Sequence, residues 1–297
     1  MFYILLTILA AFAQSSRDLL AKKLANKVNP YTLSFGILSI VSVVCLAMVI
    51  LVYLFPNFFN TELKIDFTYN FVIVFLLTGA MFAISAVLMN KAFQISELSL
   101  IIPILNFSPV FTLLLSPFLL SELPNNQAII GIFLILFGSY ILRLDLKKYS
   151  LFQPIQSLFN DKGALLMLAV AFIWGLDTIL GKIGAGQTNP YFWTFSTRLM
   201  TTILLLPMVI KSDKNWVSSL KENSFNFLIM GGFVAFSIIA QTIAVLKLDA
   251  AIVGSLLRFA TLSSVFFGWW FLKEKNFLEK ISGAIIMIVG VIFISWN

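Results

Sequence analysis

The chain carries the same pattern of residues twice, and this repeat limits its fold more than any other feature. A segment that begins at Ala92 is followed by an apolar stretch and two glycines, and the same landmarks return 152 residues later (244 − 92). The matching pairs are Ala92 and Ala244, Glu97 and Asp249, Glu122 and Glu274, Gly131 and Gly283, and Gly138 and Gly290. A second match, at a distance of 160 residues (189 − 29), joins Asn29-Pro30-Tyr31 to Asn189-Pro190-Tyr191. The pattern predicts a tandem duplication of one structural unit.

The composition indicates that both units lie in a membrane. Of the 297 residues, 60% are hydrophobic and 11% are charged, with a mean hydropathy of +0.99, whereas soluble domains carry about 25% charge. Windows of roughly 20 residues with few charges recur, and this is the length that an α-helix needs to cross a bilayer. We expect ten spans, five in each half, centred on Ala13, Val41, Ala80, Val110, Leu134, Phe172, Ile203, Val234, Leu262 and Ile286.

The predicted fold is an all-α membrane protein with ten transmembrane helices. Because five is an odd number of spans, the second unit must enter the membrane in the opposite orientation to the first. We therefore expect two inverted five-helix repeats, an architecture of secondary transporters whose substrate sites lie near the bilayer midplane. The predicted boundaries are residues 1–145 for the first repeat, 146–162 for a linker with an interfacial helix, and 163–297 for the second repeat.

The net charge of +7 does not indicate nucleic-acid binding, because the basic residues cluster in short loops. The loops after the odd-numbered predicted helices hold most of them. By the positive-inside rule these loops are cytoplasmic and both termini lie outside. We expect a multi-pass protein of the bacterial cytoplasmic (inner) membrane. Its expected partners are the lipid bilayer and a small-molecule substrate, without nucleic acid.

Missing residue types exclude several kinds of site. The chain has no histidine, which removes imidazole acid-base chemistry and histidine-ligated metals. The segment from Gly175 to Lys182 is not a phosphate-binding loop, because five residues separate its first and second matching glycines and Ile183 follows the lysine. We expect no enzymatic activity, no metal and no cofactor. Transport would then be driven by a gradient, such as that of protons, or by exchange with a second metabolite.

Arg258 is the most informative charge in the predicted spans. A charged side chain there costs about 2.5 to 3.5 kcal/mol on insertion scales, so it needs a partner or a purpose. Arg258 has no acid nearby on its own predicted helix, and its repeat counterpart is Asn106 (258 − 152). A guanidinium beside water could hold a carboxylate or phosphate through two hydrogen bonds. The alternative is that Arg258 pairs with Asp177 or Asp18 and only joins helices.

Two carboxylates lie at similar depths, Asp18 in the predicted first helix and Asp177 in the sixth. A carboxylate beside the substrate could bind and release a proton during transport. The alternative is local pairing, of Asp18 with Lys22 and of Asp177 with an arginine. The remaining predicted substrate-binding residues have structural alternatives in helix packing. They are Arg17, Arg198, Gln241 and Trp193.

The predicted fourth helix contains Pro103, Pro109 and Pro117. Each proline lacks a backbone donor, so we expect this helix to bend, and a bend could act as a gate. Glu122 and Glu274 end the predicted fourth and ninth helices. We expect both glutamates at the membrane interface, as architectural residues of the repeat.

The ordered pattern resembles the EamA domain of the drug/metabolite transporter superfamily. The first copy has Ala92 to Glu97, Pro109-Val110, Glu122, Gly131 and Gly138, and the second has Trp174-Gly175, Arg198, Ala244 to Asp249, Glu274, Gly283 and Gly290. The chain departs from the pattern at Gln14-Ser15, at Leu38 and at Thr261. The resemblance implies a transporter with a central cavity, and it implies cytoplasmic termini where the lysine distribution predicts external ones.

Repeat, charges and resemblance together predict a secondary active transporter. It would move a small polar metabolite, amino-acid-like or anionic, by alternating access, with Arg258 binding an anionic group, Asn106 orienting the ligand, and Asp177 or Asp18 carrying the coupling charge. The alternative is an exporter of cationic or aromatic drug-like compounds, in which Asp177 binds the cation.

Overall fold

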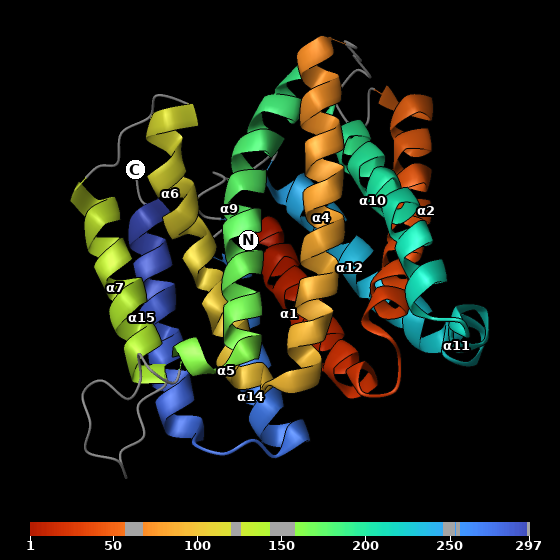
Figure 1. Cartoon of the computed structure of the whole chain (residues 1–297). Helices are drawn as coiled ribbons and strands as arrows, with labels where there is room; N and C mark the ends of the chain where they lie inside the picture. Colours follow the sequence, from red (N-terminus) through yellow and green to blue (C-terminus); the bar gives the residue numbers. More distant parts are fainter. Residues whose placement is uncertain (57–67, 120–125, 143–157, 246–252, 254–255, 296–297) are drawn as a thin grey trace.

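The computed structural model describes residues 1–56, 68–119, 126–142, 158–245, 253 and 256–295, and it is a bundle of helices (Figure 1). The described residues contain no β-strand. The helices are α1 (Phe2–Ala25), α2 (Pro30–Leu54), α4 (Tyr69–Ile95), α5 (Leu98–Ile101), the 3-10 helix η1 (Ile102–Phe107), α6 (Ser108–Leu119), α7 (Asn126–Leu142), α9 (Lys162–Gln187), α10 (Pro190–Ser212), α11 (Trp216–Glu222), α12 (Ser224–Val245), α14 (Phe259–Leu272) and α15 (Phe277–Ser295).

The repeated Asn-Pro-Tyr motif begins the second helix of each half. The Asn29 side chain accepts a hydrogen bond from the Tyr31 backbone N–H at 3.0 Å, and Asn189 accepts from the Tyr191 N–H at 2.9 Å. Proline follows each asparagine at the first helical position, where its missing N–H removes no helical hydrogen bond. The same three residues thus start α2 and α10 in the same way.

Seven of the described helical segments are long and apolar enough to cross a membrane, and two more are apolar but shorter, Ile129–Leu142 and Phe259–Leu272. The expected count was ten. All ten predicted span centres nevertheless fall within described helices. Continuous apolar runs of this length form helices because backbone groups in lipid must bond within the segment. The chain is a multi-pass membrane protein.

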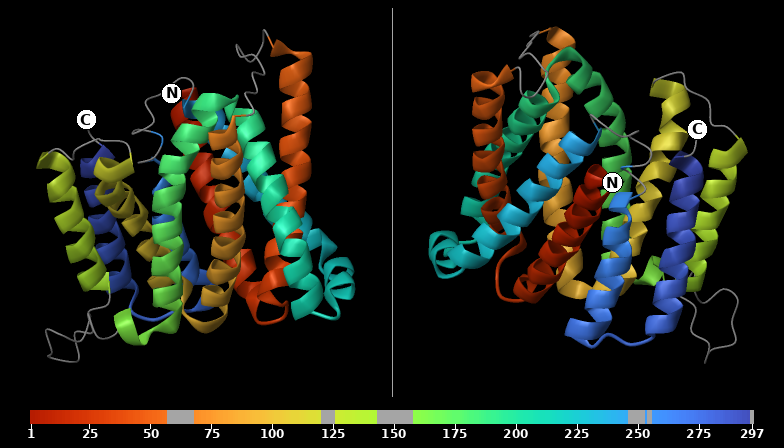
Figure 2. Two further views of the ribbon diagram at one scale, coloured as in Figure 1. Left: turned by 45° about the horizontal axis from the view of Figure 1, so that its top comes forward. Right: turned by 180° about the vertical axis from the view of Figure 1, so that it is seen from behind.

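Helices of the two halves pack against each other in exchanged pairs. α4 packs on α9 and α1 packs on α12, while α2 packs on α10 and α7 on α15. In the repeat, α12 is the counterpart of α4 and α1 is the counterpart of α9, so the α4–α9 pair corresponds to the α1–α12 pair. α1 and α9, which are counterparts, run in opposite directions, and the N-terminal end of α1 and the C-terminal end of α15 lie at the same end of the bundle (Figures 1 and 2).

The fourth helix of the first half is interrupted in its middle. α5 has four residues, and the chain then continues as η1 before α6 begins at Ser108. Pro103 lies in η1 and Pro109 follows it, and neither can donate the backbone hydrogen bond that a continuous α-helix requires. The prediction of a bent fourth helix is therefore confirmed. In the second half, α14 begins directly after Arg258, which corresponds to Asn106 in η1. Arg258 was expected within a continuous helix, so its position at a helix start corrects that expectation.

The end of the bundle opposite the two termini is rich in lysine. The helix ends and connections there include the end of α1, the α10–α12 connection and the turn between α14 and α15 (Figure 1). α11 lies in the α10–α12 connection, where the ring of Trp216 meets Phe35 of α2 edge-on at 5.8 Å. The predicted interfacial helix of the linker lies almost entirely in residues 143–157, outside the described residues. So do Glu122 and Asp249.

Candidate functional site

A cavity of about 450 Å³ lies between the two halves. Its walls come from α1, α2, α4, α9, α10, α12, from the interrupted fourth helix of the first half, and from α14 with the residues just before it, while the described parts of α7 and α15 add nothing to its lining. Six of the eight predicted substrate-binding residues line it, from four helices and the start of a fifth. They are Arg17, Asp18, Asp177, Arg198, Gln241 and Arg258.

The lining is built from matching positions of the two repeats. At a distance of 160 residues (177 − 17), the matches are Gln14 with Trp174, Arg17 with Asp177, Asp18 with Thr178 and Leu38 with Arg198. At a distance of 152 residues (234 − 82), they are Phe82 with Val234, Ser85 with Ser237, Ala86 with Ile238, Met89 with Gln241, Leu105 with Leu257 and Ser108 with Ala260. Both halves thus contribute matching positions to the cavity wall, whereas the charges at these positions differ, since Arg17 in the first half corresponds to Asp177 in the second.

The side chain of Arg258 has no hydrogen bond or ion pair with any described residue. Its Nε atom is buried without a partner. The alternative in which Arg258 pairs with Asp177 or Asp18 is therefore wrong for this structure. Arg258 itself is half-buried. A buried polar atom without a partner needs an explanation, and an ionisable residue within a membrane bundle points first to a functional site.

Asn106 lies behind the cavity wall instead of on it. It is fully buried in η1, and its side-chain oxygen lies 3.4 Å from the hydroxyl of Thr261, which does line the cavity. The amide nitrogen of Asn106 has no partner. The residue can therefore act on a ligand only through Thr261 or through the position of η1.

Asp18 pairs with its neighbour in the chain. Its carboxylate lies 2.6 Å from the guanidinium of Arg17, and its side chain is 2% exposed. The expected partner Lys22 instead donates to the backbone carbonyls of Phe93 and Ser96, both at 2.6 Å. The alternative of local pairing thus holds for Asp18, but with Arg17 in place of Lys22, because Lys22 reaches the end of α4. Asp18 already has a charge partner without a ligand.

Asp177 has no such partner. One carboxylate oxygen of Asp177 is buried without a hydrogen bond, and Arg198, an opposite charge that acts on it, makes no ion pair with it within 4 Å. The guanidinium carbon of Arg198 lies 3.6 Å from the ring centroid of Phe82, an arrangement that stabilises a cation over an aromatic face. The expected Asp177–arginine ion pair is thus absent among the described residues, and Asp177 remains available to a ligand or a proton.

Of the two remaining candidates, Gln241 lines the cavity and Trp193 does not. Gln241 lines the cavity from α12, and one turn earlier Ser237 donates to the Ala10 carbonyl of α1 at 3.1 Å. Trp193 lies outside the lining. Its ring packs on Gly184, where an added Cβ would lie 2.3 Å from a ring carbon, and it meets Phe71 edge-on at 5.9 Å. Trp193 is a packing residue in this structure.

Two aromatic residues were missed as candidates. Phe82 and Trp174 both line the cavity, and the indole N–H of Trp174 has no partner. Trp174 stands at the position that matches Gln14, and Phe82 at the position that matches Val234. Both residues thus occupy positions whose counterparts in the other half, Gln14 and Val234, also line the cavity.

Comparison with known proteins identifies the family. A sequence profile of the EamA-like transporter family matches residues 1–144 and again residues 161–296. The chain belongs to the EamA-like transporter family. EamA proteins are part of the drug/metabolite transporter superfamily. The resemblance drawn from the sequence is confirmed.

Proteins with similar sequences are described as transporters. An uncharacterized transporter of Methanothermobacter thermautotrophicus is 27% identical over 195 residues, which are 65% of this chain and 55% of that protein. An uncharacterized transporter of Clostridium kluyveri is 28% identical over 137 residues, 45% of this chain and 44% of that protein. The chain spans about half the length of the relatives that it matches. A crystal structure with 14% identity, covering 98% of this chain and 95% of its own, has a TM-score of 0.62 and shows the same fold.

Proposed function

We propose that this EamA-family protein is a secondary active transporter of a small anionic or amino-acid-like metabolite. Arg258 carries the proposal, because it lines a cavity of about 450 Å³ and its buried Nε has no protein partner. Cavities of a few hundred Å³ are of the size that binds small metabolites. A guanidinium can hold a carboxylate or phosphate through two parallel hydrogen bonds, which fixes the orientation of the ligand as well as its charge.

The remaining polar groups suggest how the ligand is held. The unpartnered oxygen of Asp177 could accept from an ammonium group or take up a proton, and Arg198 remains stacked on Phe82. Gln241 and the indole N–H of Trp174 add a donor-rich wall. Arg17 and Asp18 neutralise each other, so we assign the coupling charge to Asp177. The driving force would be a proton gradient or exchange with a second metabolite.

Alternating access between two inverted five-helix repeats is the proposed mechanism. The exchanged helix pairs, the opposite directions of α1 and α9, and the matched lining positions support it. A substrate site shared by two inverted repeats can open to either side when one repeat moves against the other. We propose the bacterial cytoplasmic membrane as its location and assign it no catalytic activity.

A second candidate function is export of cationic or aromatic compounds. It is favoured by the unpartnered carboxylate oxygen of Asp177 and by the aromatic rings of Phe82 and Trp174 in the same cavity. A carboxylate flanked by aromatic faces is suited to an organic cation. In this case Arg258 would have no role in binding.

The test compares Arg258→Ala and Arg258→Lys with the native protein in proteoliposomes. We expect Arg258→Ala to lower ligand affinity by at least about tenfold, and Arg258→Lys to recover part of it, because lysine keeps the charge but not the two-bond geometry. Lys211→Ala, at an exposed position of the lysine-rich end, is the matched control and should transport normally. Thermal unfolding of each variant excludes misfolding.

The ligand class is decided by thermal shift. Purified protein is mixed separately with carboxylates, zwitterionic amino acids, sugar phosphates and quaternary amines. Stabilisation by anions or zwitterions that disappears in Arg258→Ala supports the leading function. Stabilisation by quaternary amines that survives Arg258→Ala and disappears in Asp177→Asn would replace it with the second.

A further inference from the structure

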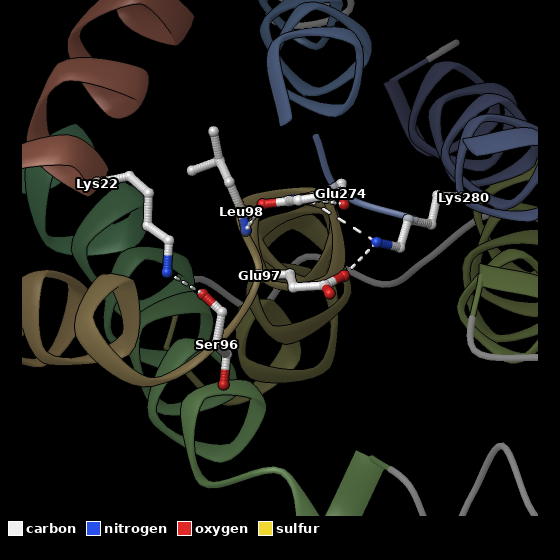
Figure 3. A network of polar contacts seen from close by, with 7 residues as sticks. Lys22, Ser96, Glu97, Leu98, Glu274 and Lys280 are labelled. Atoms are coloured by element: carbon white, nitrogen blue, oxygen red, sulfur yellow. Dashed lines mark hydrogen bonds and ion pairs between the residues drawn. The ribbon is translucent and has the colours of Figure 1, made fainter. Parts of the chain in front are cut away.

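The turn between α14 and α15 is fastened to the start of α5 by one carboxylate. Glu274 accepts a hydrogen bond from the backbone N–H of Leu98 at 2.8 Å (Figure 3). It also accepts from the backbone N–H of Ser99 at 3.0 Å and from the hydroxyl of Ser99. These two N–H groups open a helix and so have no partner within it. The Glu274 side chain is 6% exposed. One side chain of the second half therefore satisfies the beginning of the interrupted helix in the first half.

Lys280 extends this contact to a second acid. Its ammonium group pairs with the carboxylate of Glu97 and lies 3.8 Å from that of Glu274 (Figure 3). The Lys280 side chain is 5% exposed, so the pair with Glu274 is shielded from water. Such a pair is costly to break by removal of one partner, because the other charge stays buried.

The connection between α4 and α5 is also held from α1 and α9. Lys22 of α1 donates to the Phe93 and Ser96 carbonyls, as described above. The Ser96 hydroxyl donates to the Asp161 carboxylate, which also caps α9 by accepting from the N–H groups of Gly163 at 2.9 Å and Ala164 at 3.2 Å. The connection between α4 and α5 thus meets three other parts of the chain, all at the lysine-rich end of the bundle (Figure 1).

We propose that this network is the closed gate of the lysine-rich side, with Glu274 and Lys280 as the positioning residues that hold it shut. The proposal rests on the transport function above. α5 leads straight into η1, whose Ile102 and Leu105 line the cavity, so any displacement of α5 also moves the cavity wall. Opening this side requires Glu274 to leave the N–H groups of Leu98 and Ser99.

The gate is also connected to the proposed anion site. Arg258 directly precedes α14 and Glu274 follows shortly after its end. α14 has 14 residues, which corresponds to about 21 Å of helix. A ligand that moves Arg258 further into the cavity would therefore also displace α14, and Glu274, which holds the gate shut, lies just beyond the other end of this helix. Gly268 lets this helix end approach α5, since a Cβ on Gly268 would lie 2.6 Å from a Glu274 carboxylate oxygen and 3.2 Å from Ser99 Cβ.

The test measures from which side the cavity can be reached. Cys45→Ser removes the single cysteine, and Ala86→Cys puts a thiol into the cavity lining. A membrane-impermeant maleimide is then applied to right-side-out and to inverted vesicles. With Glu274 and Lys280 both present, we expect labelling from the lysine-rich side to be slow. Glu274→Gln and Lys280→Ala should each accelerate labelling from that side by about tenfold or more.

Two further variants keep the result interpretable. Ser99→Ala removes only the hydroxyl donor and should give a smaller acceleration of the same sign. Glu279→Gln, an acid of the same region outside the network, should label like the native protein. Equal labelling rates in the native protein, Glu274→Gln and Lys280→Ala would overturn the proposal, provided that thermal unfolding shows all three folded. Labelling does not require transport, so a failed Arg258 test would leave this result independent.

Discussion

Gly138 of α7 and Gly283 of α15 lie in direct backbone contact. A Cβ atom on Gly138 would be 2.7 Å from the carbonyl oxygen of Gly283, and a Cβ on Gly283 would be 2.7 Å from the carbonyl oxygen of Gly138. The related pair behaves in the same way, because a Cβ on Gly290 would be 2.7 Å from the carbonyl oxygen of Gly131. Since Gly131 corresponds to Gly283 and Gly138 to Gly290, the repeat makes one contact twice with the roles exchanged. Small residues allow membrane helices this close approach.

Gly138→Ala and Gly283→Ala should each destabilise the protein. The added methyl group meets backbone atoms, which cannot rotate away, and overpacking of this kind costs about 1–3 kcal/mol. We expect a melting temperature several degrees lower in detergent. Gly232→Ala is the matched control, because nothing lies within 4 Å of its Cβ position and alanine favours helix. Equal melting temperatures for all three variants would show that α7 and α15 are not in this contact.

Asp18→Asn should mainly reduce stability, whereas Asp177→Asn should mainly change transport. Asp18→Asn removes the partner of a buried Arg17 guanidinium, and breaking a buried pair typically destabilises by about 3–5 kcal/mol. Asp177→Asn removes a carboxylate whose buried oxygen has no hydrogen bond, so it should lower stability much less. We expect Asp177→Asn to fold and bind ligand but to lose the response of transport to an imposed pH gradient. Thermal unfolding and proteoliposome uptake measure the two effects. A pH response that survives in Asp177→Asn would show that this residue does not carry the coupling charge.

The lysine-rich end should face the cytoplasm. The positive-inside rule acts on short loops, and the described lysines near helix ends gather opposite the two termini. We expect alkaline phosphatase fused after the C-terminus to be active and a green fluorescent protein fusion there to be dark. The same reporters inserted at Asn215, between α10 and α11, should give the reverse. Fluorescence at the C-terminus would favour the internal termini that the family resemblance implies.

The sequence was sufficient to predict the helices, the duplication and the bent fourth helix. Apolar runs of bilayer length have one way to bond their backbone groups, so the span centres could be placed without tertiary information. Pro103 and Pro109 lack donors wherever they stand, so the interruption at η1 was also local in origin. The sequence also indicated in part that Arg258 has no ion-pair partner, because no acidic residue lies near it on its own predicted helix.

The side-chain contacts between helices could be found only from the tertiary structure. Most faces of these helices are apolar, so hydrophobic periodicity does not indicate which face meets the cavity. Lys22 therefore could not be assigned to the end of α4 in place of Asp18, nor Trp193 to Gly184 in place of the cavity. The partners of Glu274 could not be predicted either, because the N–H groups of Leu98 and Ser99 are 176 and 175 residues away. Local bonding rules and burial determine that helices form, whereas the side chains that meet depend on the rotation and crossing of helices far apart in the chain.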